Sequence, residues 1–142
     1  MADEGEISWS YDDGSPCLGI RLKTYNGSEY PSESPEEILV FIDTGYDGEI
    51  CIPWRIYAEL GFERWEEPES KEYETADKRV ISMKVANGCI LIPKHSPVII
   101  PVKVETPTEE EHTDEEEIII GTKFIKRFRL LLDGPAEKAC LL

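Results

Sequence analysis

The sequence predicts a single all-β domain with one or two short helices. Short apolar runs bounded by Gly, Pro, Asn, Asp or Ser recur along the chain, a pattern typical of strands separated by turns. The chain also has 142 residues, 40% of them hydrophobic. That size and composition suit one core and argue against wholesale disorder. We therefore expect one domain over residues 1–142.

The first elements are strands around polar connections. Residues 7–11 and 17–25 are expected strands, and residues 12–15, Asp-Asp-Gly-Ser, are expected to form the turn between them. Asn26-Gly27 then opens a polar loop that carries Pro and Ser and reaches residue 37.

The next run, residues 38–42, is continuously apolar, which predicts a strand buried on both faces. It stops at Asp43, so an acid stands directly at the end of a buried strand. Residues 50–52 form another short apolar stretch closed by Pro. Residues 54–60 can form about two helical turns, with Gly61 as the C-terminal stop.

Later strands are expected over residues 80–86 and 89–92. They flank Asn87-Gly88, a strong hairpin signal that predicts a tight turn at this point. Residues 98–104 predict a further strand, and the prolines at 97 and 101 place it at an edge or in an irregular position.

Residues 105–117 carry eight acids and are expected to form a solvated loop. A calcium site is the sharper alternative, but the Gly and the alternating Asp or Asn of a calcium loop are missing. The last ordered block begins with residues 118–120 and Gly121. Helical spacing over residues 122–128 and an apolar run at 130–132 complete it.

Composition narrows the partners. The net charge of -15 argues against nucleic acid, whose phosphates would repel the chain. No apolar run approaches the length of a membrane span, and the acidic N-terminus is unlike a signal peptide, so we expect a soluble, cytoplasmic protein. The absence of Gln, with many Glu, Lys and Ile, suggests a thermophilic source.

Free thiols are favoured over disulfides or a zinc site for the four scattered cysteines, Cys17, Cys51, Cys89 and Cys140.

Catalysis, if present, falls to carboxylates. His95 and His112 have no neighbouring Ser or Cys in a nucleophile-elbow setting, and the sequence has no Gly-rich phosphate loop or metal-ligand cluster. Asp43 is the outstanding candidate, because a strand fixes its backbone and Thr44 and Gly45 suit a tight turn. The tripeptide alone is weak, since it can be an ordinary turn and arises by chance in roughly a few per cent of chains this long.

The segments around Asp43-Thr44-Gly45 strengthen the interpretation of this tripeptide as a catalytic motif. Phe41-Ile42-Asp43-Thr44-Gly45 and the later Ile119-Ile120-Gly121 followed by a helix resemble the two active-site elements of retropepsin-like aspartic proteases. Between them, Ile52-Pro53 and Ala58-Glu59-Leu60-Gly61 are similar to the stretch that follows the family's active-site loop. Thr75-Ala76-Asp77 resembles its flap. The resemblance spans about residues 18–133.

The resemblance implies an acid-protease closed β-barrel and a homodimeric endopeptidase. A single chain supplies one Asp, so Asp43 of each subunit would meet at a two-fold axis and activate a water, with no metal or organic cofactor. Thr44 and Gly45 would support the active-site loop. Asp47 would contact the peptide backbone, or else be a solvated turn acid. Residues 71–79, with Thr75, Ala76 and Asp77, would form a flap that closes over a peptide substrate.

Three residues depart from the family pattern: Tyr46 where a small residue is usual, Lys78 where the flap carries Gly, and Lys123 where Asp or Asn is common. They favour an alternative, a retropepsin-fold dimerisation or peptide-binding module with little catalysis. An unrelated β domain is a further alternative, which would make the two motif ends coincidental.

Overall fold

The computed structural model describes residues 7–95, 99–108 and 117–142. Strands dominate them, and two short α-helices and two short 3-10 helices complete the described part of the chain, so the all-β prediction is confirmed. The elements run in the order β1 (Ile7–Ser10), β2 (Cys17–Lys23), β3 (Glu29–Tyr30), β4 (Ile38–Ile42), β5 (Ile50–Cys51), α1 (Trp54–Glu59), η1 (Phe62–Trp65), β6 (Lys71–Glu74), β7 (Val80–Leu91), η2 (Pro93–His95), β8 (Ile99–Pro107), β9 (Ile119–Ile120), α2 (Thr122–Ile125), β10 (Leu130–Asp133) and β11 (Lys138–Leu141).

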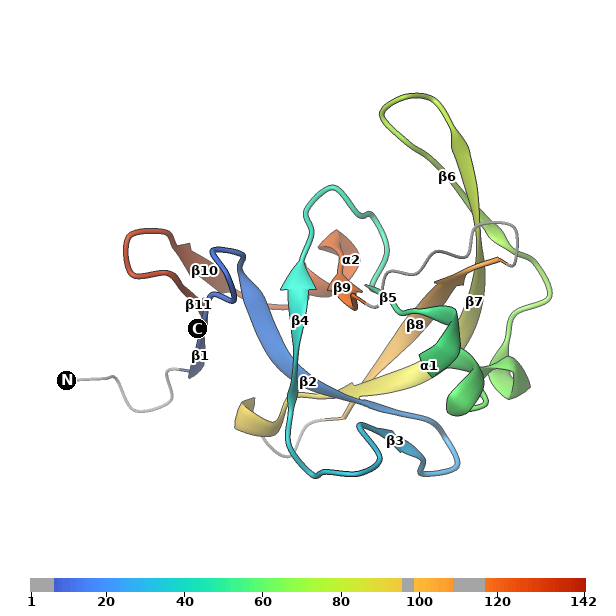
Figure 1. Cartoon of the computed structure of the whole chain (residues 1–142), viewed down its shortest axis with the longest axis horizontal. Coiled ribbons are helices and arrows are strands. Elements are labelled where there is room, and N and C mark those ends of the chain that lie inside the picture. The colour runs from blue at the N-terminus through green and yellow to red at the C-terminus, as the bar shows by residue number, and fades with distance from the viewer. Residues whose placement is uncertain (1–6, 96–98, 109–116) are drawn as a thin grey trace.

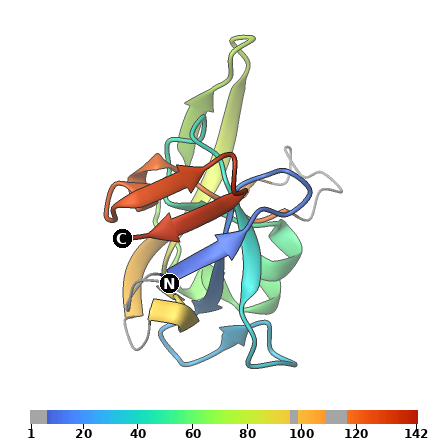
Figure 2. The same ribbon diagram turned by 90° about the vertical axis from the view of Figure 1, so that its left-hand side faces the viewer.

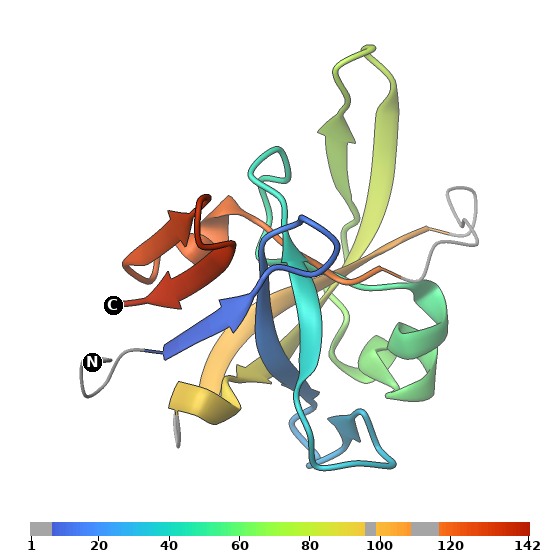
Figure 3. The same ribbon diagram turned by 60° about the vertical axis from the view of Figure 1, so that its left-hand side comes forward.

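The main sheet closes into a barrel. Its order is β3-β2-β4-β9-β5-β8-β7-β6, and a further pairing of β2 with β7 joins the ends of the ring. Strands β3 and β6 lie outside that ring. The hairpin of β6 and β7 projects beyond the barrel, on the same side as the loop that follows β4 (Figures 1 and 3). The hairpin of β6 and β7 and the loop after β4, which are distant in sequence, therefore lie on the same side of the barrel.

A second, three-stranded sheet is formed by the two ends of the chain. Strand β11 lies between β1 and β10 and pairs antiparallel with both (Figure 2). Strand β11 follows a Gly-Pro turn and is an element that the sequence analysis did not anticipate. Because β1 pairs with β11 of its own chain, the strands at the two chain ends form this sheet within a single copy of the chain.

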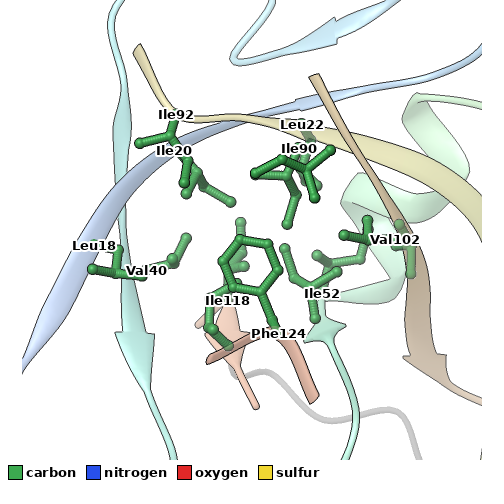
Figure 4. Packing of buried hydrophobic residues seen from close by; sticks show 14 of the residues in the cluster. Leu18, Ile20, Leu22, Val40, Ile52, Ile90, Ile92, Val102, Ile118 and Phe124 are labelled. Carbon is green, nitrogen blue, oxygen red and sulfur yellow. The ribbon is translucent and has the colours of Figure 1, made fainter. Parts of the chain in front are cut away.

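The barrel interior is filled mainly by Ile, Leu and Val side chains, with Phe124 entering from α2 (Figure 4). Branched side chains suit this interior because they pack well on pleated strands. The largest fully buried side chains are Tyr57, Phe62, Phe124, Leu18, Ile20, Leu22, Ile50, Ile52, Ile56, Ile90, Ile92 and Ile120.

The prediction of a hairpin turn at Asn87-Gly88 is wrong. Strand β7 runs straight through both residues, which pair with Lys103 and Val102 of β8. Gly88 is required for packing instead, because a Cβ there would lie 2.7 Å from the ring of Phe62. The chain reverses later, after β7, and η2 forms part of that connection.

Other boundaries also differ from the expectation. Strand β4 is not buried on both faces, since Leu39 is 46% exposed on its outer side. Residues 105–107, expected in the acidic loop, belong to β8, and Glu105 is 2% exposed. Residues 109–116, with His112, lie outside the described residues. The helix expected over 122–128 is shorter, ending at Ile125.

All four cysteines are free thiols, as expected. Among the described residues, no helix is long and apolar enough to cross a membrane.

Candidate active site

Asp43 lies where β4 ends, and its backbone is fixed on the neighbouring strand. Strands β4 and β9 run parallel, with Ile42 opposite Ile120. The Asp43 N–H continues that ladder by donating to the Ile120 carbonyl at 2.9 Å. The Asp43 side chain is exposed. The two motif ends that the sequence singled out are therefore hydrogen-bonded neighbours, with the carboxylate facing outward from their shared edge.

The turn after β4 is closed around the Asp43 carboxylate. The Gly45 N–H donates to Oδ1 of Asp43 at 2.9 Å, and the Tyr46 N–H donates to the Asp43 carbonyl at 3.1 Å. A Cβ on Gly45 would lie 3.2 Å from the same Oδ1, a close contact that glycine avoids. Residues 43–48, called the active-site loop below, thus hold the carboxylate in a defined orientation.

Tyr46 points into the protein, away from the exposed Asp43. Its side chain is 8% exposed and lies between Gly48 and Gly121. A Cβ on Gly48 would lie 2.3 Å from the Tyr46 hydroxyl oxygen, and one on Gly121 would lie 2.6 Å from its ring. Two glycines thus make the space for a bulky residue at this position, and the ring is largely buried rather than projecting toward the carboxylate.

The start of α2 is attached to the active-site loop through backbone groups. The Thr122 N–H donates to the Tyr46 carbonyl at 2.9 Å, and the Lys123 N–H donates to the Gly48 carbonyl at 3.2 Å. The Thr122 hydroxyl also donates to Oδ1 of Asp47 at 3.2 Å. Asp47 is exposed but held in place, so its carboxylate is available at a fixed position.

A cleft of about 540 Å³ separates the active-site loop from the projecting hairpin, residues 71–83, called the flap hairpin below. Of the predicted site residues, Gly45 and Asp47 line its lower wall, and Thr75 and Ala76 line the wall formed by the hairpin. The remaining lining residues are Tyr46, Glu72, Tyr73, Glu74, Ile81 and Met83.

Asp43 and Thr44 line a different hollow, of about 440 Å³, which includes the turn residues Asp12 and Asp13 and also Glu117. Of the four residues expected to contact the peptide, Asp47, Thr75 and Ala76 line the cleft under the flap hairpin, and Asp77 is not among its lining residues. The structure places the candidate catalytic carboxylate at the edge of a second hollow. Gly45, adjacent to Thr44 in the chain, belongs to the cleft.

The tip of the flap hairpin is a tight turn without glycine. The Thr75 N–H donates to the Arg79 carbonyl at 2.7 Å, and Lys78 adopts a left-handed backbone with φ 65°. The Thr75 hydroxyl donates to the Asp77 carboxylate, and this hydrogen bond lowers the pKa of Asp77. Lys78 thus takes the conformation for which glycine is favoured, while Asp77 lies on the exposed tip.

Sequence reasoning missed a buried polar cluster beneath the cleft. Glu105 on β8 accepts hydrogen bonds from the hydroxyls of Tyr46, at 2.7 Å, and Tyr73, at 2.6 Å. Burial raises the pKa of both phenols, with the Glu105 charge adding to it, so both keep their protons. The only sequence signal is an acid following the alternating apolar positions of β8.

Lys123 lies on the exposed side of this region. It shares a hollow of about 310 Å³ with Lys71, Glu49 and Glu105. Burial, followed by the neighbouring Lys123 side chain, lowers the pKa of Lys71. Lys123 lines this hollow and is not among the residues that line the Asp43 hollow. Among the described residues, no group of three or more His, Cys, Asp or Glu is arranged to hold a metal ion.

Comparison with known proteins supports this architecture at the level of the fold. No protein-family model matches the sequence, and no curated protein matches it either. Among solved structures, the chain is similar to a retropepsin-like aspartic protease from Rickettsia conorii. The match has a TM-score of 0.58 and 16% sequence identity, and covers 96% of this chain and 89% of that chain. The chain therefore has the predicted retropepsin-like fold.

Proposed function

We propose that the protein is an aspartic endopeptidase whose active site forms between two copies of the chain. The observation that carries the proposal is the position of Asp43. It is an exposed carboxylate at the end of a barrel strand, oriented by the Gly45 amide and backed by the parallel β4–β9 pair. The likeness to a retropepsin-like aspartic protease supports the same fold for this arrangement.

One chain supplies half of the catalytic pair. The sequence contains a single Asp-Thr-Gly, and peptide hydrolysis of this type needs two carboxylates. A two-fold axis beside Asp43 provides the second one from an identical loop. Strand β10 presents Leu131 and Leu132, 49% and 41% exposed, as apolar surface that a second copy would cover. Thr44, exposed next to Asp43, would brace the paired loops.

The chemistry of the pair follows from electrostatics. Two carboxylates about 3 Å apart cannot both ionise, so they share one proton. The charged Asp43 takes a proton from a water, which attacks the peptide carbonyl while the protonated partner polarises its oxygen. The C–N bond then breaks as the leaving nitrogen receives a proton. These steps use only carboxylates and water.

The cleft under the flap hairpin is the site we assign to the peptide. An extended chain can lie between Asp47 on the loop and Thr75 and Ala76 on the hairpin, which line the same 540 Å³ space. The exposed tip, with Asp77, then covers the substrate as a lid and excludes water from the reaction.

The test compares wild type with Asp43→Asn and with Glu59→Gln, an acid-to-amide change of equal charge on the exposed side of α1. Each is incubated with a denatured protein from about pH 3 to 7, with and without a statine inhibitor. We expect wild type and Glu59→Gln to cleave, statine to block them, and Asp43→Asn to lose cleavage. Equal cleavage by Asp43→Asn refutes the proposal. If neither wild type nor either variant cleaves the denatured protein but all three bind it, the protein is the peptide-binding module instead.

A further inference from the structure

Glu105 joins two elements that approach the cleft from opposite sides. Its carboxylate is 2% exposed, and one oxygen, Oε1, accepts from both tyrosine hydroxyls, Tyr46 at 2.7 Å and Tyr73 at 2.6 Å. The other oxygen, Oε2, lies 3.9 Å from the Lys71 ammonium. A buried carboxylate is costly unless it is hydrogen-bonded, and here both oxygens have partners.

The partners belong to different parts of the fold. Tyr46 comes from the active-site loop, whereas Tyr73 and Lys71 come from β6 of the flap hairpin. The two tyrosine rings also contact each other, with centroids 5.8 Å apart, and the Lys71 ammonium lies 4.9 Å from the centre of the Tyr73 ring. Glu105 on β8 therefore connects the base of the hairpin to the loop that carries Asp43.

The hydrogen bonds to Glu105 hold the flap hairpin at its base, where few residue pairs attach β6 to the barrel. Only four residue pairs join β6 to β7, and β6 lies outside the closed ring of strands. Hydrogen bonds to an ionised acceptor are about twice as strong as neutral ones. Because burial keeps both phenols protonated, both can donate to the same carboxylate. Tyr73 and Lys71 thus fix the base of the hairpin, while the tip at residues 75–79 lies beyond them.

We propose that Glu105 is a positioning residue that couples the flap hairpin to the active-site loop and sets the width of the cleft between them. The coupling itself depends only on the contacts of Glu105, whereas its effect on substrate binding rests on the proposed function. Closing of the hairpin would shift Tyr73, and Glu105 would pass that shift to Tyr46 and the turn that orients Asp43. Linkage requires the coupling to act equally in the reverse direction.

The test uses variants that remove one hydroxyl at a time. Tyr73→Phe removes the hydrogen bond from the hairpin to Glu105, and Tyr46→Phe removes the one from the active-site loop. Tyr57→Phe is the matched control, because the Tyr57 hydroxyl donates to a glutamate, Glu66, at 2.8 Å, away from the cleft. All three exchanges keep the ring, and circular dichroism with thermal melting checks that each variant folds.

The readout is hydrogen exchange at amides whose hydrogen bonds define each segment. Tyr73→Phe should speed exchange about ten-fold at the Gly45 and Tyr46 amides, although the change is on the hairpin. Tyr46→Phe should do the same at the Thr75 and Lys78 amides. Tyr57→Phe should leave all four amides unchanged. Effects confined to the segment that carries the substitution, or an equal effect of Tyr57→Phe, would overturn the proposal.

A second readout applies when the protein cleaves peptides. A loosened hairpin weakens contacts made equally to substrate and transition state, so Tyr73→Phe should raise KM about ten-fold and change kcat by less than about two-fold. An unchanged KM in Tyr73→Phe contradicts a role for Glu105 in setting the cleft. Absence of cleavage by wild type refutes the proposed function alone, since the exchange measurement still decides the coupling.

Discussion

Replacing Gly121 by alanine should damage the active-site loop and the stability of the whole domain. A Cβ at this position would lie 2.3 Å from the Gly48 carbonyl oxygen, 2.6 Å from the Tyr46 carbonyl oxygen and 2.6 Å from the Tyr46 ring. Two of these atoms are backbone, which cannot swing aside as a flexible side chain can. The backbone of Gly121 itself has φ −102°, so the damage comes from lack of space and not from backbone strain.

The size of the effect follows from the crowding. Overpacking a well-packed core costs about 1–3 kcal/mol, and contacts with backbone on two sides place Gly121→Ala at about 3 kcal/mol. An unfolding entropy of about 2.1 cal/mol/K per residue, over 142 residues, corresponds to about 0.3 kcal/mol per degree. We therefore expect a Tm about 10 °C below that of the wild type.

The assay is thermal unfolding by circular dichroism at one fixed protein concentration, because the proposed dimerisation would make Tm depend on concentration. Gly134→Ala is the matched control, since a Cβ there meets nothing within 4 Å. Its Tm should stay within about 3 °C of the wild type. If Gly121→Ala melts as Gly134→Ala does, then Tyr46 and Gly48 do not pack against Gly121 as described, and the account of the active-site loop fails.

Two further predictions concern the flap hairpin and the thiol nearest the polar cluster. Lys78→Gly should raise Tm by about 2–3 °C, because glycine adopts the left-handed φ of 65° without the cost of a Cβ; an unchanged or lower Tm contradicts the strained turn. Burial, followed by the Glu105 charge, raises the pKa of the Cys51 thiol to about 12, so at pH 8 the thiol is protonated and iodoacetamide should modify it slowly. Glu105→Gln removes the charge that opposes the Cys51 thiolate, so that pKa should fall and Cys51 should react faster, with Cys17 unchanged; equal rates in both proteins would show that Glu105 does not act on Cys51.

Local sequence patterns predicted the elements that carry the candidate site. The apolar run of β4 ending at Asp43 is recognisable because a strand needs only a short continuous stretch and a clear stop. The helix α1 and its end at Gly61 were predictable for the same reason, and Gly61 does adopt a left-handed φ of 71°. The Ile119-Ile120-Gly121 segment gained its meaning from order along the chain rather than from its own pattern.

Misassigned elements are those where tertiary packing overrides a local signal. Asn87-Gly88 has the composition of a tight turn, yet Gly88 serves to admit the Phe62 ring beside a continuous strand. Strand β11 is short and follows a Gly-Pro turn, and it exists because β1 and β10 pair with it from both sides. Neither outcome can be found by reading a single window of sequence.

Buried polar residues were the hardest to predict, because their partners are distant in sequence. Glu105 is separated from Tyr46 by 59 residues and from Tyr73 by 32, so its acid looked like the first member of a solvated acidic run. Arg21 is similar. It lies in β2, is buried, and donates to the carbonyls of Ser34 and Glu36 at 2.6 Å. Nothing in the strand pattern indicates that an arginine there fixes a loop.

The most direct test of the central claim is a subunit-mixing experiment with wild type and Asp43→Asn. Equal amounts are mixed, allowed to exchange subunits, and assayed for peptide cleavage against the same total concentration of wild type. If Asp43 of two copies forms one site, random pairing leaves about a quarter of the dimers with two aspartates, so activity should fall to about a quarter. Activity of about a half would mean that each chain cleaves alone, which contradicts the shared site.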